Sequence, residues 1–226
     1  LTVASPMAEL PSGAAFGTLV HAALERLDWS EQRLASDAAR IATELGTRSG
    51  FSPAQCRTLA ASLEALCRTP LAPLTEATLS ELGTAARLAE LDFDLPLADQ
   101  GRPATVGELT SLMAQHLDRD DPLAEYPSRL AATEAADGVL NGFLTGSIDA
   151  VLRVPGGGFL VVDYKTNNLS PSPEVPQILG HYTPDAMAEA MMQAHYPLQA
   201  LLYCAALHRY LGLRLRGYDP HRHLGG

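Results

Sequence analysis

A short segment in the second half of the chain concentrates residue types that can bind a metal ion and a phosphate. Asp149 lies before the glycine-rich segment 155–158, and Asp163 and Lys165 lie after it. Carboxylate oxygens are ligands that Mg²⁺ and Mn²⁺ prefer, and lysine is a compact cation that suits phosphate. The three residues are therefore candidates for a metal-assisted site.

Two runs rich in β-branched and aromatic residues predict the strands of a β-hairpin, 142–154 and 159–165. With the turn centred on Gly156 and Gly157, Asp149 faces Asp163 or its neighbour. Cross-strand partners have Cβ atoms about 5 Å apart, and two carboxylates at that spacing repel unless one is protonated or a cation neutralises them. Lys165, two residues beyond Asp163, leaves the same face of its strand.

Spacing alone leaves a second interpretation of these residues open. Asp163 and Lys165 could form an ion pair on a solvent-facing strand, because a single D-x-K triplet is a weak motif. His21 stands alone on a predicted amphipathic helix. A single histidine in such a position is more often a packing or surface residue than a metal ligand.

Elements with helical and strand periodicity surround the hairpin. Apolar residues at intervals of three and four predict helices over 16–27, 29–45, 53–67, 106–117, a segment opening at Thr183, and 196–211. Ser52 and Pro53 provide an N-cap and a first-turn proline. Residues 89–97 alternate apolar and acidic side chains, which predicts a half-buried strand.

The order of helices, strands and again helices predicts an α/β or α+β fold. We expect a small mixed central sheet flanked by helices, preceded by an N-terminal helical portion. On this interpretation residues 1–88 are mainly helical and residues 89–226 contain the sheet and the candidate site.

The 226-residue chain is acidic and poor in cysteine, with a formal net charge of −10 and three cysteines. Cys56, Cys67 and Cys204 show no C-x-x-C spacing, which argues against a disulfide framework, a zinc ribbon or an iron–sulphur site and favours a reducing cytoplasm. An acidic chain cannot rely on bulk attraction to phosphates, so any nucleic acid must be delivered by a partner or gripped locally.

The ends and the hydropathy of the chain suggest a piece of a larger polypeptide rather than a membrane protein. No run approaches the roughly 18 apolar residues of a membrane span. The N-terminus has no initiator methionine and no signal-like segment. We therefore expect a fragment of a longer, cytoplasmic protein.

The sequence Asp149, then Asp163-Tyr164-Lys165, resembles the PD-(D/E)XK nuclease signature, with aspartate at the second acidic position. Four longer stretches are similar, and in the same order, to stretches of the nuclease domain of RecB-type helicase–nucleases (exodeoxyribonuclease V): residues 16–21, 146–149, 162–167 and 196–203. The resemblance covers nearly the whole chain. It is most specific over 142–226 and weak over 30–88.

This resemblance implies a restriction-endonuclease-like fold and a deoxyribonuclease that depends on Mg²⁺, with Mn²⁺ as an alternative. Asp149 and Asp163 would hold the metal, helped by the backbone carbonyl of Tyr164 and by the imidazole of His21. Lys165 would orient the attacking water or stabilise the charge that develops on the phosphate.

Two further polar residues, Gln199 and Tyr203, stand at i and i+4 on one helix face. The resemblance implies that they help position the substrate strand, although a helix packing polar groups is the alternative. The stretch 209–223 is locally basic, which suits a phosphate contact, a partner surface or an exposed helix end.

The resemblance also implies partners and an alternative function. The partners would be DNA single strands fed by a helicase, the rest of a RecB-like chain, RecC-like and RecD-like subunits, and the recombinase RecA. We expect a single nuclease domain over 1–226. The alternative is a non-catalytic module that recruits RecA, against which the intact Asp149, Asp163 and Lys165 speak.

Overall fold

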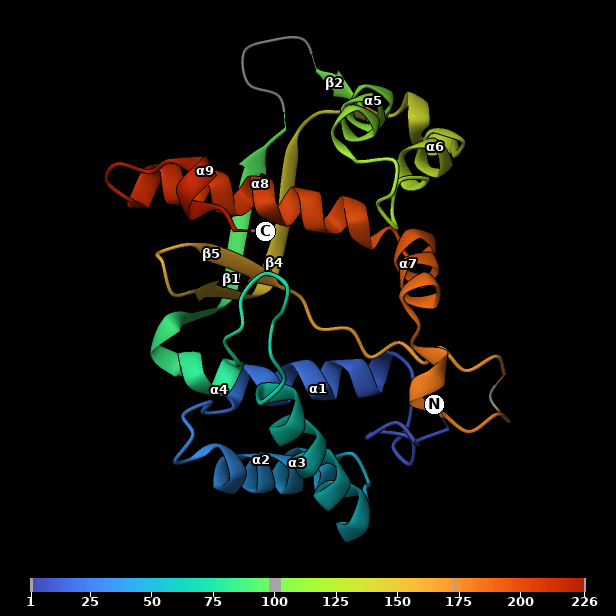
Figure 1. Cartoon of the computed structure of the whole chain (residues 1–226), viewed down its shortest axis with the longest axis vertical. Helices are drawn as coiled ribbons and strands as arrows, with labels where there is room; N and C mark the ends of the chain where they lie inside the picture. Colours follow the sequence, from blue (N-terminus) through green and yellow to red (C-terminus); the bar gives the residue numbers. More distant parts are fainter. Residues whose placement is uncertain (1, 98–102, 173, 226) are drawn as a thin grey trace. The chain divides into compact units, whose positions relative to one another are not determined.

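The computed structural model describes residues 2–97, 103–172 and 174–225 (Figure 1). The chain divides into two compact units. The first unit comprises residues up to Leu91, Ile148–His181 and residues from Leu207 on, and the second comprises Asp92–Ser147 and Tyr182–Ala206. The chain passes from one unit to the other four times: inside β1 (Arg87–Pro96), β4 (Phe143–Arg153) and α8 (Tyr196–Arg214), and between His181 and Tyr182.

Three helices dominate the first unit: α1 (Ala14–Arg26), α2 (Leu34–Arg48) and α3 (Pro53–Cys67). The predicted bounds of α3 are confirmed, because Ser52 and Gln55 cap each other's backbone N–H groups in a capping box. The prediction that α2 begins at Trp29 is wrong. The Ser30 N–H bonds to the Asp28 carboxylate and a turn follows, so the helix begins at Leu34.

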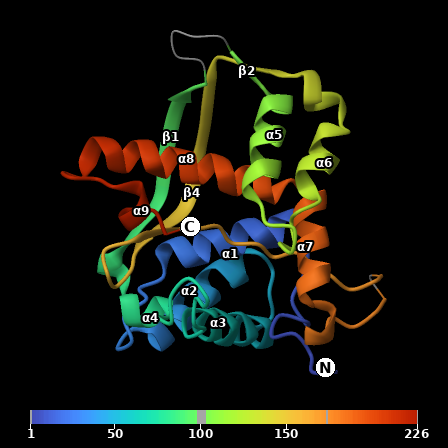
Figure 2. The ribbon, with the colours of Figure 1, turned by 45° about the horizontal axis from the view of Figure 1, so that its top comes forward.

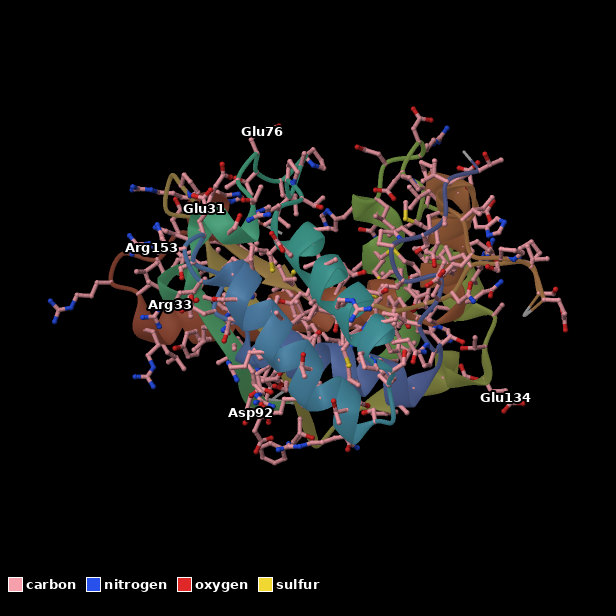
Figure 3. All side chains as sticks on the ribbon, turned by 90° about the horizontal axis from the view of Figure 1, so that it is seen from below. Glu31, Arg33, Glu76, Asp92, Glu134 and Arg153 are labelled. Atoms are coloured by element: carbon pink, nitrogen blue, oxygen red, sulfur yellow. The ribbon has the colours of Figure 1, made fainter. Side chains whose placement is uncertain are left out.

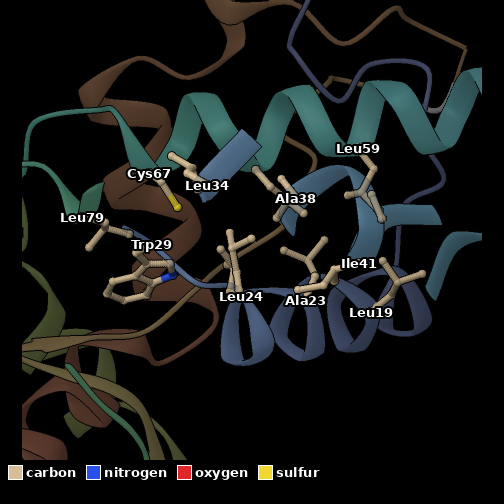
Figure 4. Packing of buried hydrophobic residues seen from close by; sticks show 14 of the residues in the cluster. Leu19, Ala23, Leu24, Trp29, Leu34, Ala38, Ile41, Leu59, Cys67 and Leu79 are labelled. Carbon is tan, nitrogen blue, oxygen red and sulfur yellow. The ribbon is translucent and has the colours of Figure 1, made fainter. Parts of the chain in front are cut away.

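The apolar faces of these helices form one core, shown in Figure 4. The buried residues of α1, with Leu19 and Leu24 among them, pack against Ile41 of α2 and Leu59 of α3. Ala150, Leu152 and Leu160 join the same core from the hairpin. The helical packing therefore fixes one face of the hairpin, and alternation places Asp149 on the other face, where Val151 is also buried.

The sheet of three strands has the order β1-β4-β5, with β5 at Phe159–Val162. β4 and β5 pair antiparallel, with Ala150 opposite Val162 and Arg153 opposite Phe159, which confirms the predicted register. Gly156 and Gly157 form the turn with φ of 92° and 89°. Phe159 also makes an isolated parallel bridge to Leu224. The predicted α/β class with a small sheet is confirmed.

The second unit holds further helices, labelled α5, α6 and α7 in Figures 1 and 2, and a short pair of strands. The helices are α5 (Val106–His116), α6 (Tyr126–Ala131) and α7 (Pro184–Gln193), and the paired strands are β2 (Ala104–Thr105) and β3 (Val139–Leu140). Helix α6 was not predicted. Its Tyr126 and Leu130 are buried against Met192 of α7, a contact distant in sequence.

The remaining helices are short: α4 (Leu79–Leu82), α9 (Pro220–His223) and the 3₁₀ turns Thr84–Ala86, Glu134–Asp137 and Leu179–His181. Charged side chains such as Glu31, Glu76 and Arg153 are exposed and lie at the periphery in Figure 3. In the described ranges no helix has both the length and the apolar character that crossing a bilayer requires.

Candidate active site

The hairpin ends in a side-chain contact instead of a further strand pair. β5 stops at Val162, although residues up to Lys165 were predicted to be strand. The backbone N–H of Tyr164 donates to Asp149 Oδ2 at 2.7 Å, so a carboxylate takes the place of a main-chain carbonyl. This hydrogen bond to a side chain ends the β-ladder, and it fixes Asp149 beside the Asp163–Lys165 segment.

His21 reaches the same point from α1. Its Nε2 donates to the carbonyl oxygen of Tyr164 at 2.7 Å, and its Nδ1 lies 3.3 Å from Asp149 Oδ2. The His21 and Tyr164 rings also meet edge to face, with centroids 5.9 Å apart. The structure thus brings together His21, Asp149 and the Tyr164 carbonyl, three of the four groups that the sequence nominated as metal ligands.

Two features of α1 that sequence reasoning missed place His21 there. A Cβ on Gly17, one turn before His21, would lie 3.2 Å from Thr166 Oγ1, so the glycine permits a close approach of α1 to the segment after Lys165. At the other end, Arg87 donates to the carbonyl oxygens of Leu24, Glu25 and Leu27 and caps the helix. An isolated helical glycine was the available signal for the first feature.

Arg87 holds this position as a half-buried cation. Its guanidinium carbon lies 4.2 Å from the centroid of the Trp29 ring, which is fully buried. Burial lowers the pKa of Arg87, opposed by nearby Tyr164. The side chain of Glu25, whose carbonyl Arg87 binds, is exposed.

Asp163 and Lys165 form an ion pair on the same side of the hairpin end. Burial raises the pKa of Asp163; Lys165 opposes that shift, and the charge of Asp149 adds to it. The Asp149 charge thus disfavours ionisation of Asp163, as expected for two carboxylates on neighbouring strands. Each carboxylate has a protein partner, Lys165 for Asp163 and the Tyr164 N–H for Asp149.

The side chain of Tyr164 points the other way, into the helical core. Burial strongly raises its pKa, and its hydroxyl has no hydrogen-bond partner among the described residues. The Asp-Tyr-Lys triplet, which follows the last residue of β5, therefore has two functions. Tyr164 anchors the hairpin end in the core, while Asp163 and Lys165 pair with each other.

The donor set fits a hard divalent cation in its chemistry. Two carboxylates, a backbone carbonyl and an imidazole are oxygen and nitrogen ligands of the kind that Mg²⁺ and Mn²⁺ accept. Within the described ranges, no three His, Cys, Asp or Glu side chains are close enough to bind one ion as they stand. The physical reason is that Asp163 is drawn to Lys165 while His21 bonds to the Tyr164 carbonyl.

Gln199 and Tyr203 lie in the second unit, on one face of α8. Gln199 Nε2 donates to the Tyr203 hydroxyl at 2.8 Å, and the Tyr203 ring meets the edge of Phe93 at 5.8 Å. The two residues are thus oriented by each other. In the basic stretch, Arg209, Arg214 and Arg222 are exposed.

Comparisons with known proteins identify the family of the chain. The family model of the PD-(D/E)XK nuclease superfamily matches residues 3–217. The chain is 47% identical to RecBCD enzyme subunit RecB of Mycolicibacterium smegmatis, over 99% of the chain and 21% of that protein. It is 44% identical to RecB of Mycobacterium tuberculosis, over 98% of the chain and 21% of that protein.

A more distant relative is RecB of Escherichia coli, 34% identical over 96% of the chain and 16% of that protein. The chain thus spans about a fifth of the length of the mycobacterial relatives. The resemblance to a RecB nuclease domain found in the sequence is confirmed. With the family model matching nearly its whole length, the chain belongs to the PD-(D/E)XK nuclease superfamily.

Proposed function

We propose that this chain is the metal-dependent DNA-cleaving domain of a RecB-type helicase–nuclease, acting in double-strand break repair and recombination. The observation that carries the proposal is the convergence of His21, Asp149 and the Tyr164 carbonyl at the hairpin end, next to the Asp163–Lys165 pair. The family model and the RecB relatives support a nuclease. The dependence on Mg²⁺ or Mn²⁺ is part of the proposal.

The residues would divide the work as follows. Asp149, Asp163, the Tyr164 carbonyl and His21 would hold the cation. A bound divalent cation supplies Lewis-acid polarisation of a phosphate and lowers the pKa of a water. His21 would contribute the lone pair of one ring nitrogen, while at present its Nε2 donates to the Tyr164 carbonyl.

Lys165 would act on the substrate and not on the metal. Its ammonium group is paired with Asp163, and once a cation neutralises that carboxylate the lysine can turn to the phosphate or the attacking water. A fixed cation beside the developing phosphorane charge is worth about 10²–10³ in rate. Gln199 and Tyr203, which orient each other on α8, would help position the strand.

The net charge of −10 favours a nuclease that binds DNA only weakly by itself. The relatives are RecB subunits of RecBCD enzymes, and this chain covers only part of each. Within the proposal, the rest of a RecB-like chain with RecC-like and RecD-like subunits would deliver single strands to the hairpin. RecA recruitment is the alternative use of the same domain.

The test measures cleavage of single-stranded DNA by the chain with Mg²⁺, Mn²⁺ or EDTA, together with calorimetric binding of each metal. We expect cleavage that EDTA abolishes, and metal binding that is lost in Asp149→Ala and in Asp163→Ala. The matched control is Glu76→Ala, an exposed acid in the same unit, which should bind metal and cut normally.

Two results would overturn parts of the proposal. Metal binding that survives both aspartate substitutions would place the ion elsewhere. A chain that binds metal but cuts no DNA, even when joined to its helicase, would favour the non-catalytic module that recruits RecA.

A further inference from the structure

The second unit contains a pocket of about 280 Å³ whose lining includes Gln199 and Tyr203, the two residues assigned above to positioning the strand. Aromatic and imidazole rings, aliphatic side chains and one carboxamide line it: Phe93, His195, Tyr203, Leu198, Leu202 and Gln199. None of the described residues that line it is Asp, Glu, Lys or Arg. A pocket of this composition suits a flat, neutral ring and disfavours a phosphate, which would require a cation.

Phe93 forms one wall because β4 carries a glycine opposite it. A Cβ on Gly146 would lie 2.7 Å from Phe93 Cζ, closer than real Cβ contacts allow, so only glycine lets the ring lie against the strand. The Phe93 ring then meets Tyr203 at an interplanar angle of 76°. The two aromatic side chains are therefore fixed by the backbone and by each other.

His195 forms another wall and is held in an uncommon backbone conformation. It lies between α7 and α8 with φ of 56°, a region that favours glycine at the end of a helix. Its Nδ1 lies 3.1 Å from the hydroxyl of Tyr126, a residue with no solvent exposure. The buried Tyr126 thus orients the imidazole of His195. Ending helix α7 would not by itself require this contact.

The polar atoms of the pocket suit the edge of a heterocycle. The Gln199 carboxamide carries both a donor and an acceptor group, and its contact with the Tyr203 hydroxyl fixes its direction. Base stacking on aromatic side chains, with little sequence preference, is the usual way in which proteins hold an unpaired strand. The volume of the pocket, its aromatic rings and the lack of charged groups among its described lining residues all agree with an unpaired base as the ligand.

We propose that this pocket seats one unpaired nucleobase of a DNA strand, stacked on Phe93 and contacted at its edge by Gln199. The inference rests on the proposed function for the identity of the polymer. Gly146 stands three residues before Asp149 on the continuous strand β4, so one element carries both a pocket residue and a candidate metal ligand. The pocket would make the domain selective for unpaired DNA, because a paired base cannot enter it.

The experiment measures binding of a short single-stranded oligonucleotide in EDTA, so that cutting plays no part. One nucleotide at a time is replaced by an abasic residue, or by the fluorescent base 2-aminopurine, along the strand. The variant is Phe93→Leu, which keeps an apolar side chain and removes the ring. The matched control is Phe143→Leu, since Phe143 is a phenylalanine of β4 that is 69% exposed and does not line the pocket.

In the wild type and in Phe143→Leu, we expect an abasic residue at one position to weaken binding about tenfold, and 2-aminopurine there to change its fluorescence. In Phe93→Leu the intact and abasic strands should bind alike, and the fluorescence change should disappear. His195→Asn, which tolerates the same backbone conformation, should behave in the same way while its unfolding temperature stays near that of the wild type.

An abasic penalty of equal size in the wild type and in Phe93→Leu would overturn the proposal. So would a wild-type chain that binds intact and abasic strands equally, or that binds no single-stranded DNA. Binding is measured without cleavage, so a failure of the proposed nuclease activity is seen separately in the metal-dependent assay. A chain that cuts DNA but shows no abasic penalty retains its nuclease function and loses only this pocket.

Discussion

The helical core of the first unit and the hairpin end attached to it are stabilised in different ways. In the core, residues such as Leu24, Ile41 and Leu59 have no solvent exposure and share many apolar neighbours. At the hairpin end, Asp149 and Lys165 depend on a few directed contacts to specific oxygen or nitrogen atoms. Core contacts are numerous and non-directional, whereas each polar contact is specific to one atom pair.

The difference separates stability from chemistry. A core substitution removes packing energy and leaves the polar groups in place, provided the chain still folds. A substitution at the hairpin end removes few contacts that stabilise the fold, but it removes a group that the reaction needs. The two regions should therefore respond oppositely to matched measurements of cleavage rate and unfolding temperature.

The largest effect is expected for Lys165→Ala. Cleavage should fall by about 10²–10³ or more, because a cation positioned at the developing charge is lost. Metal binding and unfolding temperature should stay near the parent values, since an exposed ion pair stabilises little. Arg153→Ala removes an exposed cation from the same hairpin and should cut normally. Cleavage by Lys165→Ala at near the parent rate would make Lys165 a strand-surface residue.

The reverse pattern is expected for Leu59→Ala in the core. The free energy of unfolding should drop by about 2–5 kcal/mol, as for other buried leucines replaced by alanine. Cleavage per folded molecule should remain unchanged at a temperature where the variant is folded. Urea unfolding and a rate normalised to the folded fraction are the measurements. A specific loss of rate would show that the core and the hairpin end are energetically coupled.

Gly17→Ala tests the contact that joins the two regions. Its Cβ would lie 3.2 Å from Thr166 Oγ1, so Thr166 or α1 must give by a few tenths of an ångström, and a shift of α1 would carry His21 with it. We expect about a tenfold loss of cleavage, because small displacements at a reacting centre are costly. The free energy of unfolding should change little, because the higher helix propensity of alanine, about 1 kcal/mol, offsets the tight contact with Thr166.

The control for Gly17→Ala is Gly212→Ala in α8. There the nearest atom to the new Cβ is Tyr218 Cδ1 at 3.8 Å, an ordinary contact. This variant should keep full activity and be slightly more stable. Equal losses of activity in Gly17→Ala and Gly212→Ala would contradict a specific role for the close contact between α1 and Thr166.

The smallest effect is expected for Asp163→Asn without metal. Burial raises the pKa of Asp163, so the ionised carboxylate disfavours the folded state once the pH exceeds its folded pKa. The neutral amide should raise the unfolding temperature in EDTA by about 2 °C at neutral pH, and by less in acid. Asp149→Ala should do the opposite, because it leaves the Tyr164 N–H without its acceptor.

Local signals made several elements predictable from the sequence. The Ser52-Pro53 start fixed α3, and the paired glycines at 156 and 157 fixed the hairpin register, because both signals lie within the elements that they determine. The choice of Asp149 as the partner of the 163–165 segment followed from that register. The roles of these residues in catalysis stay predictions.

Features that depend on tertiary contacts were not predictable. β5 ends at Val162 because a side chain, Asp149, captures the next N–H, and no periodicity encodes that capture. Helix α6 has only six residues, too few to show a helical period, and its Tyr126 and Leu130 pack with Met192 from α7. The pocket around Phe93 is defined by a glycine more than fifty residues away in sequence, Gly146.

The position of Ala150, Leu152 and Leu160 in the helical core has a practical consequence for truncating the protein. The composition of the chain changes near residue 88, which makes a cut there attractive for isolating the sheet-containing part. Such a cut would strip the hairpin of α1, α2 and α3 and expose three buried apolar side chains to solvent. A fragment 89–226 would lose His21 and would tend to aggregate, so the weakly family-like segment 30–88 must be retained.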